Sequence, residues 1–306
     1  MKRLCPICRS GRTAVFAHVH RYRYLRCNVC ELVYLDPLPS AQLVRTTYKG
    51  DYVFRVNDTA LQRFESITTK VIQQMRTMNP RGRSLLDIGA GYGTGVRLAV
   101  HEGLDAYGIE PAQNLFRSAR NQLGSRMIRA DFDQYLKQSS RKFDFILLIH
   151  VIEHVRNPQA FIRNVITRLN PNGILYIETP NSQSHLLRIE QDLYTFLTPP
   201  DHIHLFGPSS LEILIKNTDG RVLRTSTYSY PEHLVGIMRK LISRAPRYHD
   251  SNTGNMSEPA PVDYRAGSQL PFFDRVLAPQ ITPLLNLGKQ GSILQVYIQK
   301  NKPLLL

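Results

Sequence analysis

A glycine-rich segment, Arg83 to Gly95 (RSLLDIGAGYGTG), constrains the fold of this chain more than any other part of its sequence. Its apolar start predicts a buried strand, and the apolar period of Thr94 to Glu102 predicts a helix. A strand, a glycine loop and a helix in this order form a common nucleotide cradle. Glycine allows the backbone to approach a ligand closely, and free N–H groups at the helix start face that ligand.

The spacing of the glycines separates this loop from the dinucleotide fingerprint GxGxxG. Glycines alternate over Gly89–Gly95, and Asp87 precedes them on the predicted strand. A second predicted strand, Asp105 to Ile109, ends in Glu110, 21 residues after Gly89. A carboxylate at such a position can accept hydrogen bonds from ribose hydroxyls. The pattern predicts a doubly wound domain for a ribose-containing ligand; a related domain that binds another nucleotide, or nothing, is the alternative.

The following segments continue the alternation of strands and helices. Lys142–Ile149 (KFDFILLI) is nearly all apolar, which is typical of a central strand in a parallel sheet. His150, Glu153 and His154 follow it directly, and ligands of open α/β sheets bind beyond the carboxyl ends of the strands. Further strands are expected at Arg126–Ala130, Ile174–Glu178, Arg221–Tyr228 and Ser292–Gln299.

All four cysteines lie near the start of the chain, as the pairs Cys5–Cys8 and Cys27–Cys30. Two CxxC pairs separated by 18 residues predict a four-cysteine zinc ribbon. Two disulfides are the alternative, which a reducing compartment disfavours. Four thiolates leave no open position on the ion, so the expected zinc is structural. His18 and His20, between the pairs, are expected to be exposed strand residues.

The charge balance points to an anionic partner. The chain of 306 residues carries 39 basic and 24 acidic side chains, a net charge of +15. Nucleic acid, a phosphorylated substrate or an acidic membrane face would suit it, and a basic surface that only confers solubility is the alternative. The basic residues are scattered.

No segment is apolar over the roughly 18 residues of a membrane span, and no apolar signal region precedes Cys5, so we expect a cytoplasmic protein.

Two of these stretches together resemble a known family. DIGAGYG followed by GIEP resembles motif I and the acidic ribose residue of class I S-adenosylmethionine (SAM) methyltransferases. FDFILLIHVIEHVRNP resembles motif IV of the same family. The resemblance implies a Rossmann-like α/β fold with a seven-stranded sheet and a SAM site. The residues it places around SAM are Asp87, Gly89, Ala90, Gly91, Glu110, Pro111, Asp131, Phe132 and His150.

The resemblance also implies individual roles. In the family, an acidic residue at the place of Asp131 accepts from the adenine amino group, and its apolar neighbour, here Phe132, packs on the ring; a helix cap is the alternative for Asp131. The segment Asp201–Phe206 (DHIHLF) resembles the substrate-side loop, where a histidine, here His202 or His204, reaches the acceptor.

A hydroxyl or carbon acceptor must lose a proton, and histidine suits that task because its reference pKa is about 6.5. His154 is the first candidate for the general base, His202 the second and His150 the third. Glu153 is expected to orient one of these histidines. Alternatively, His150 and Glu153 only shape the pocket for the methionine part of SAM.

The N-terminal run CxxCxLVYLDPLPS, followed by Tyr48 and Tyr52, resembles the start of many bacterial methyltransferases of sugar, polysaccharide and secondary-metabolite tailoring. There the tyrosine segment covers the active site as a lid; a packing linker is the alternative. We expect a zinc ribbon at 1–35, a helical linker or lid at 36–80 and a methyltransferase domain at 81–306. An insert at 229–291 is interpreted as a cap over the acceptor or a docking element for a membrane or partner, with a spacer as the alternative.

The sequence thus predicts SAM-dependent methyl transfer to a small-molecule acceptor. The expected acceptor is anionic or sugar-containing, such as a nucleotide- or lipid-linked sugar, or a natural-product scaffold. An RNA methyltransferase is the second hypothesis, because a zinc ribbon and a basic surface also suit RNA; the motif IV form and the lack of an aromatic-basic signature oppose it. A SAM-binding module without catalysis is the third.

Overall fold

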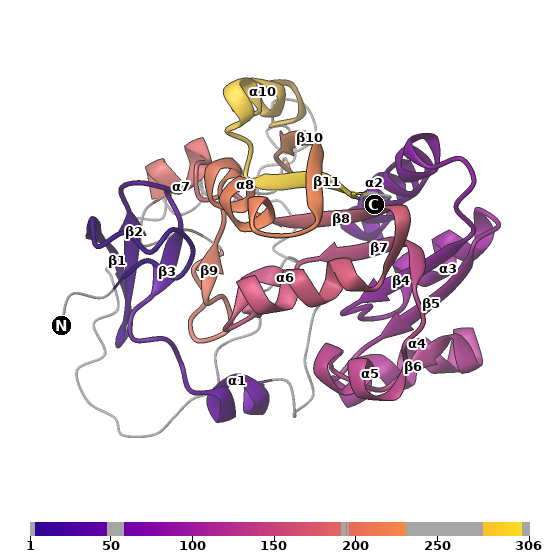
Figure 1. The fold of residues 1–306 in the computed structure, drawn as a ribbon. Helices are drawn as coiled ribbons and strands as arrows, with labels where there is room; N and C mark the ends of the chain where they lie inside the picture. Colours follow the sequence, from indigo (N-terminus) through magenta and orange to yellow (C-terminus); the bar gives the residue numbers. More distant parts are fainter. Residues whose placement is uncertain (1–3, 48–57, 191–193, 195, 231–277, 302–306) are drawn as a thin grey trace.

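A seven-stranded sheet with helices on both faces forms the body of the molecule (Figure 1). The computed structural model describes residues 4–47, 58–190, 194, 196–230 and 278–301. The strands of this sheet are β4 (Ser84–Ile88), β5 (Asp105–Ile109), β6 (Met127–Ile128), β7 (Phe143–Ile149), β8 (Leu169–Pro180), β10 (Gly220–Tyr228) and β11 (Ile293–Lys300). Their order is β10-β11-β8-β7-β4-β5-β6; β11 pairs antiparallel with β10 and with β8, and the other pairs are parallel.

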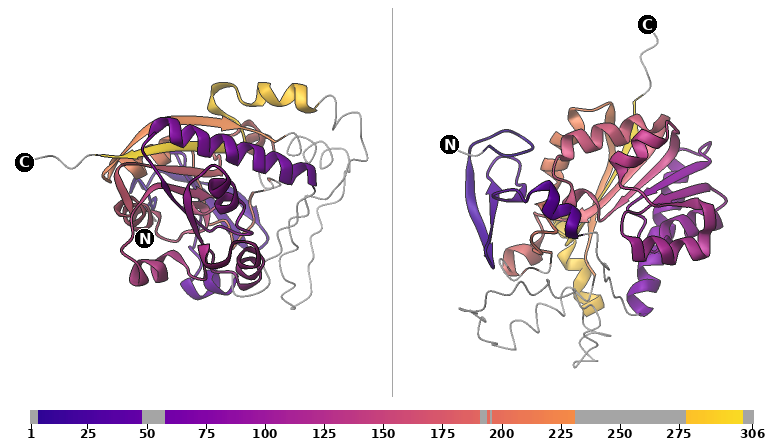
Figure 2. Two further views of the ribbon diagram at one scale, coloured as in Figure 1. Left: turned by 90° about the vertical axis from the view of Figure 1, so that its right-hand side faces the viewer. Right: turned by 90° about the horizontal axis from the view of Figure 1, so that it is seen from below.

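Three helices pack on each face of the sheet because its strands are apolar on both sides (Figure 2). One face, with Leu85 and Leu147, packs against α2 (Asp58–Met78), α3 (Thr94–His101) and α4 (Gln113–Leu123). The opposite face, with Leu86 and Leu148, packs against α5 (Phe132–Gln138), α6 (Pro158–Thr167) and α8 (Pro208–Lys216). Alternate residues of one strand therefore fill two separate cores. The predicted α/β class and seven-stranded sheet are confirmed.

The N-terminal ribbon forms a second sheet, which lies beside the first (Figures 1 and 2). Its strands are β1 (Thr13–Val19), β2 (Tyr22–Cys27), β3 (Val33–Leu35) and β9 (His204–Leu205), in that order and antiparallel. The strand β9 comes from the predicted substrate-side loop, far along the chain. This sheet therefore crosses the predicted boundary between the ribbon and the methyltransferase domain.

The short elements complete the described chain. They are α1 (Ala41–Thr47), η1 (Gly124–Arg126), η2 (Ile152–His154), α7 (His185–Glu190), α10 (Ala278–Leu285) and η5 (Leu287–Lys289). Two predictions, the tyrosine lid of Tyr48 and Tyr52 and most of the insert at 229–291, lie outside the described residues. The third strand of the sheet is shorter than predicted, because only Met127–Ile128 pair with β5.

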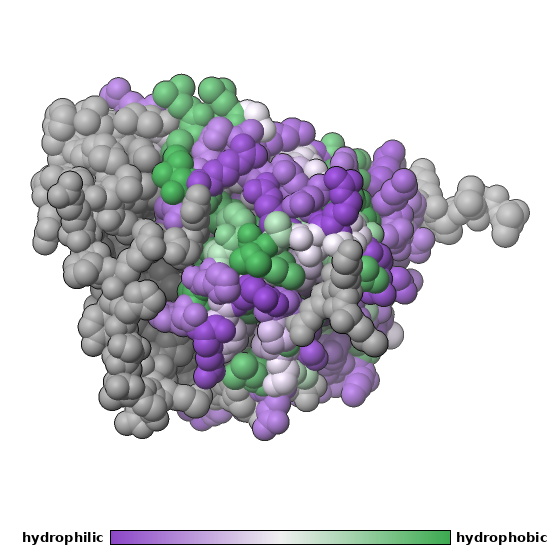
Figure 3. Space-filling view, turned by 90° about the vertical axis from the view of Figure 1, so that its left-hand side faces the viewer, coloured by the Kyte–Doolittle hydropathy of each residue, from purple (hydrophilic) through white to green (hydrophobic). Residues whose placement is uncertain are grey.

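The described surface is mostly hydrophilic on the side where the ribbon lies, with small hydrophobic groups between the polar side chains (Figure 3). Exposed apolar residues on the ribbon include Leu4, Val15 and Val29. Over the part of the chain that the structure describes, no helix combines the length and the apolar character needed to span a bilayer.

Candidate functional site

The glycine loop between β4 and α3 adopts backbone conformations that favour glycine. Gly89, Gly91 and Gly93 have φ angles of 74°, 54° and 78°, in the left-handed region that side chains disfavour. A Cβ on Gly89 would lie 2.7 Å from the side chain of Val151, which follows β7. A Cβ on Gly91 would meet no atom within 4 Å. The loop thus packs against motif IV at Gly89 and has open space at Gly91.

Glu110 faces this loop from the carboxyl end of β5. Its Oε2 accepts from the backbone N–H of Gly91 at 2.9 Å, and its Oε1 accepts from that of Ala112 at 2.7 Å. The side chain is buried, and burial raises its pKa although both backbone hydrogen bonds oppose the shift. Each carboxylate oxygen has two lone pairs, so each can accept one further hydrogen bond. Glu110 therefore retains acceptor capacity next to the glycine loop, and its contact with a ribose stays a prediction.

The other predicted residues around the loop lie close to it. Asp87 is buried beneath the start of α3 against Gly95, and burial together with the charge of Glu110 raises its pKa to about 7. Ala90 donates its N–H to the carbonyl of Ile109 at 3.0 Å, which ties the loop to β5. Pro111 is exposed directly after Glu110. These positions gather at the carboxyl ends of β4 and β5, around the glycine loop.

Asp131 and Phe132 stand at the start of α5. Asp131 is its N-cap: Oδ1 accepts from the N–H of Gln134 at 2.8 Å, and the N–H of Asp131 donates to Oε1 of Gln134. Phe132 is 5% exposed and packs edge-on against Phe161. The structure thus realises the helix-cap alternative for Asp131, and the adenine contacts of both residues stay predictions.

His150 directly follows β7 and lies between two carboxylates. Its Nδ1 lies 2.9 Å from Oε1 of Glu153, and its Nε2 lies 3.9 Å from Oε1 of Glu178. Its φ of 53° is rare for a residue with a side chain, and such backbone strain clusters at functional sites. Burial lowers the pKa of His150, but the hydrogen bond and charges of the two glutamates outweigh burial and raise it. The ring is one-third exposed and stacks on Phe196.

His154 and His202 form a pair of adjacent rings, 4.8 Å apart between centroids. The Nδ1 of His154 lies 3.1 Å from a carboxylate oxygen of Asp201. Burial lowers the pKa of His154, but the charge of Asp201 and its hydrogen bond raise it to about 9. The Nδ1 of His202 lies 2.7 Å from the carbonyl oxygen of Phe196. Burial and the charge of His154 lower the pKa of His202. The directions of these two shifts favour a positive charge on His154 and a neutral imidazole on His202.

Glu153 is fully buried beneath these histidines. Its oxygens contact Nδ1 of His150 and the hydroxyl of Thr179, which donates at 3.0 Å. Burial would raise its pKa, but the neighbouring histidines lower it to about 2. Glu153, His154 and His202 each bring one ligand atom within 4.8 Å of the others, so they form one of two described groups able to hold a metal ion.

Glu178, at the carboxyl end of β8, was not among the predicted site residues. It accepts hydrogen bonds from the hydroxyls of Tyr176 and Tyr228 and from the amide of Gln295. The hydroxyl of Tyr228 also lies 2.8 Å from that of Tyr230. A buried glutamate near the end of an apolar strand was the available signal, since that edge of the sheet carries the ligand site.

His204 does not belong to the group formed by His154 and His202. It is fully buried in β9, both ring nitrogens lack a hydrogen-bond partner among the described residues, and burial lowers its pKa to about 4. Of the two histidines in the substrate-side loop, the structure therefore brings only His202 to the other site residues.

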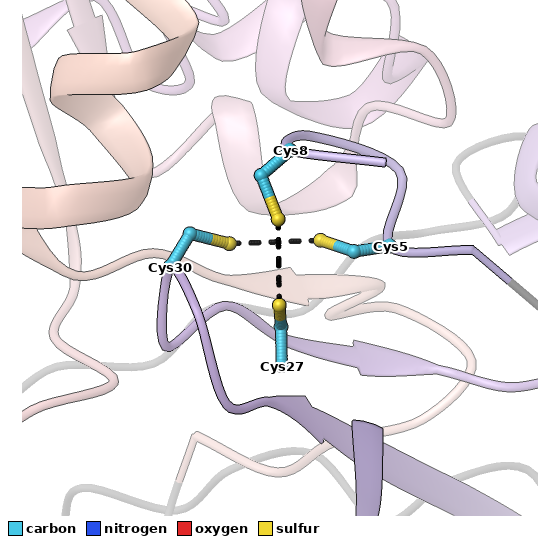
Figure 4. Close-up of side chains that lie close together, drawn as sticks. All are labelled: Cys5, Cys8, Cys27 and Cys30. Carbon is cyan, nitrogen blue, oxygen red and sulfur yellow. Dashed lines mark hydrogen bonds between the residues drawn. The ribbon is translucent and has the colours of Figure 1, made fainter. Parts of the chain in front are cut away.

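The four cysteines converge on one point between the ribbon turns (Figure 4). Sγ of Cys5 lies 3.6 Å from that of Cys30, and Sγ of Cys8 lies 3.4 Å from that of Cys27. All four sulfurs fall within 4.8 Å of one another, and none forms a disulfide. A tetrahedral zinc with Zn–S bonds of about 2.3 Å spaces its sulfurs by roughly 3.8 Å. The arrangement fits such an ion and disfavours the disulfide alternative. His18 and His20 are exposed, as predicted.

The family of the chain follows from comparison with known proteins. Residues 60–224, more than half of the chain, match a family model described as "Methyltransferase domain". This protein belongs to the methyltransferase domain family. The membership of a methyltransferase family that the sequence resemblance implies is thereby confirmed.

Individual relatives agree with this family. A ubiquinone biosynthesis O-methyltransferase of Azorhizobium caulinodans is 32% identical over 111 residues, which is 35% of this chain and 44% of the relative. One of Coxiella burnetii (strain Dugway 5J108-111) is 26% identical over 155 residues, 47% of this chain and 65% of the relative. The matched parts thus span about half to two thirds of these relatives.

A solved structure shares the fold. The crystal structure of a SAM-dependent methyltransferase from Archaeoglobus fulgidus matches 77% of this chain and 94% of its own chain, with a TM-score of 0.50 and 17% sequence identity. This likeness supports the Rossmann-like architecture of the methyltransferase domain. The roles of the individual site residues of this chain stay predictions.

Proposed function

We propose that this methyltransferase transfers a methyl group from SAM to a hydroxyl of a small, ring-containing acceptor, such as a nucleotide- or lipid-linked sugar or a natural-product scaffold. The observation that carries the proposal is the position of Glu110. Its carboxylate is held against the N–H of Gly91, and a Cβ at Gly91 would meet open space. A ribose bound there would place the rest of SAM along the loop toward His150, since Val151 packs on Gly89.

The surroundings of His150 support an acceptor with a ring and hydroxyl groups. Phe196 lies nearly parallel to the rings of His150 and His202, each 6.1 Å away between centroids. Glu153 and Glu178 supply carboxylate oxygens nearby. Of these groups only His150 is appreciably exposed, by one-third of its side chain, so its ring is the surface against which an acceptor ring would stack. The names of the ubiquinone relatives, which are O-methyltransferases, support oxygen as the methylated atom.

His202 is our proposed general base, ahead of His154. When bound, SAM supplies an activated methyl group on its sulfonium for in-line displacement, so placement of the acceptor is the main task of the protein. His202 is neutral at neutral pH because burial and the charge of His154 lower its pKa. A neutral imidazole can take the proton of an acceptor hydroxyl. His154, held protonated by Asp201, maintains that state of His202.

We also propose a structural zinc ion on Cys5, Cys8, Cys27 and Cys30. Support comes from the convergence of the four sulfurs and from the absence of a disulfide between them. Such an ion has no open position, so its expected contribution is to the folding of the ribbon.

Binding of S-adenosylhomocysteine, the demethylated product, tests the cofactor site by calorimetry. We expect Glu110→Gln to weaken binding about tenfold or more, because the amide nitrogen cannot accept a hydrogen bond. Asp105→Asn is the matched control: it changes a carboxylate at the other end of β5, where Asp105 pairs with Arg126 and Arg141 on the surface. Equal affinity of wild type and Glu110→Gln, or no binding by wild type, would refute the proposed site.

The acceptor class is tested by methyl transfer from labelled SAM to a panel of nucleotide sugars, lipid-linked sugars, phenols and RNA. Label in a sugar or phenol supports the proposal. Label in RNA, with the steep salt dependence of phosphate contacts, would support the RNA methyltransferase hypothesis instead.

A further inference from the structure

The ribbon and the segment of His202 share backbone hydrogen bonds. The strand β3 pairs with β9, with Val33 opposite Leu205 and Tyr34 opposite His204. In addition, Leu35 donates its N–H to the carbonyl of Ile203 at 2.9 Å. Residues 203–205 thus obtain their strand partner from the first 35 residues of the chain, whereas Phe206 forms a bridge with Asn181 directly after β8.

One ribbon side chain reaches His202 itself. The hydroxyl of Tyr24, on β2, donates to the carbonyl oxygen of His202 at 2.7 Å. Tyr24 is fully buried, and burial raises the pKa of its phenol, so the hydroxyl remains a donor. Its ring belongs to a core cluster that includes Leu35, Phe196 and Leu205. Phe196 of this cluster is the residue whose carbonyl oxygen contacts Nδ1 of His202.

The opposite side of the segment is attached to motif IV. The N–H of Ile203 donates to the carbonyl oxygen of Glu153 at 2.8 Å. Ile203 therefore links β3 through its carbonyl and η2 through its N–H. Because the backbone at 202 and 203 is held from both sides, the distance between the rings of His202 and His154 depends on where the ribbon sits.

The cysteine turns fix the ribbon to the domain. The carbonyl oxygen of Glu31, directly after Cys30, accepts from the hydroxyl of Ser182, which follows β8, at 2.9 Å. The carbonyl oxygen of Ile7, between the first two cysteines, accepts from the side-chain amide of Gln159 on α6 at 3.0 Å. A displacement of the cysteine cluster would therefore shift both attachments and, through β3, the strand β9.

We propose that the ribbon is a positioning element for the acceptor side of the active site, and that Tyr24 is the positioning residue that sets the backbone of His202. The inference deepens the proposed function and rests on it for the role of His202. The ordered cysteine cluster holds β3 in place, β3 and Tyr24 hold residues 202–205, and these hold the imidazole beside His154. Loss of the cysteine cluster should thus change the position of His202 and leave the glycine loop and Glu110 in place.

Tyr24→Phe tests the proposal in the full chain, because it removes one hydroxyl and keeps the buried ring. Tyr22→Phe is the matched control, because Tyr22 lies on the same strand. Its hydroxyl accepts a hydrogen bond from Arg21 at the surface. We measure amide hydrogen exchange of residues 200–206, the imidazole ¹⁵N signals of His202 and the affinity for S-adenosylhomocysteine. The expected result for Tyr24→Phe is exchange about tenfold faster and a changed His202 signal, with affinity within about twofold of wild type.

A second arm needs no variant. Treatment of the wild-type protein with EDTA should speed exchange in residues 200–206 while binding of S-adenosylhomocysteine persists. Once an acceptor is known, kcat should fall about tenfold in Tyr24→Phe, with KM for SAM unchanged, because small misplacement of a catalytic group is costly. Unchanged exchange and unchanged His202 signals in both arms would overturn the proposal. Parallel loss of S-adenosylhomocysteine binding in both arms would also overturn it, since the effect would then be general unfolding. Failure of wild type to bind S-adenosylhomocysteine at all would instead count against the proposed function.

Discussion

At the residue scale, a substitution at Gly91 distinguishes an effect on ligand binding from an effect on the stability of the fold. A Cβ at this position would strain the backbone, whose φ is 54°, but would meet no atom of the protein within 4 Å. We expect Gly91→Ala to cost about 1–2 kcal/mol of stability and to lower affinity for S-adenosylhomocysteine at least tenfold. Calorimetry and thermal melts measure the two effects.

Gly103→Ala is the control for this variant. Gly103 also has a positive φ, 81°, and open surroundings, but it lies in the turn after α3, away from the loop. It should lose similar stability and keep its affinity. If both variants lost affinity equally, the effect at Gly91 would be strain and not occlusion of a ligand.

The charge of His154 beside the ring of His202 gives a prediction for pH dependence. The pKa of His202 is lowered by burial and by the positive charge of His154. His154→Gln removes that charge, so the pKa of His202 should rise, and the acid limb of the kcat profile should move to higher pH. NMR titration of the His202 ring measures the pKa directly. An unchanged pKa, or one that falls, would contradict the coupling.

Replacement of the base itself should have a larger effect. We expect His202→Ala to lower kcat about 100-fold or more, the usual contribution of a general base, while affinity for S-adenosylhomocysteine stays near that of wild type. The measurement is steady-state methyl transfer to an acceptor found in the panel. A variant with wild-type kcat would remove His202 from the mechanism.

At the element scale, we expect the proposed zinc ion to stabilise the ribbon, because so short a segment buries little apolar surface within itself. Elemental analysis should find about one zinc per chain in the native protein, and Cys27→Ser should lose it. His18→Ala and His20→Ala are controls with the metal retained, since both histidines are exposed on the hairpin. Native protein without zinc, or zinc loss in the histidine variants, would contradict the four-cysteine site.

The sequence is sufficient for elements whose signals are local. The glycines of the loop need left-handed backbone whatever surrounds them, and the apolar run before His150 forms a central strand because both of its faces are buried. The CxxC pairs bring four sulfurs together because each turn already aims two of them. These features were predicted within one or two residues.

Features that depend on contacts across the chain were not predicted. The strand β9 has only two residues and exists because β3 offers it a free edge, which no local pattern announces. The pairing of Asp201 with His154 joins a loop to motif IV. Such pairs lie many residues apart, and a sequence read locally cannot tell that Asp201 raises the pKa of His154 while His202 keeps a lowered one.

At the scale of the whole molecule, the ribbon and the methyltransferase domain share their cores. Cys5, Cys27 and Leu32 belong to the same buried cluster as Leu86 and Leu148 of the main sheet. Another cluster joins Tyr24 of the ribbon to Ile293 of β11. From these shared clusters we expect the ribbon to add to the stability of the domain and to unfold together with it.

Thermal unfolding therefore provides the final prediction. The native protein should unfold in one cooperative transition, seen at the same temperature by far-UV circular dichroism and by calorimetry. Removal of the metal with EDTA should lower the Tm of that whole transition by roughly 5 °C or more, since the metal-dependent contacts are part of the common core. A separate early transition of the N-terminal region, with the main Tm unchanged, would show instead that the ribbon is an independent module, and β9 would then have to keep its position without β3.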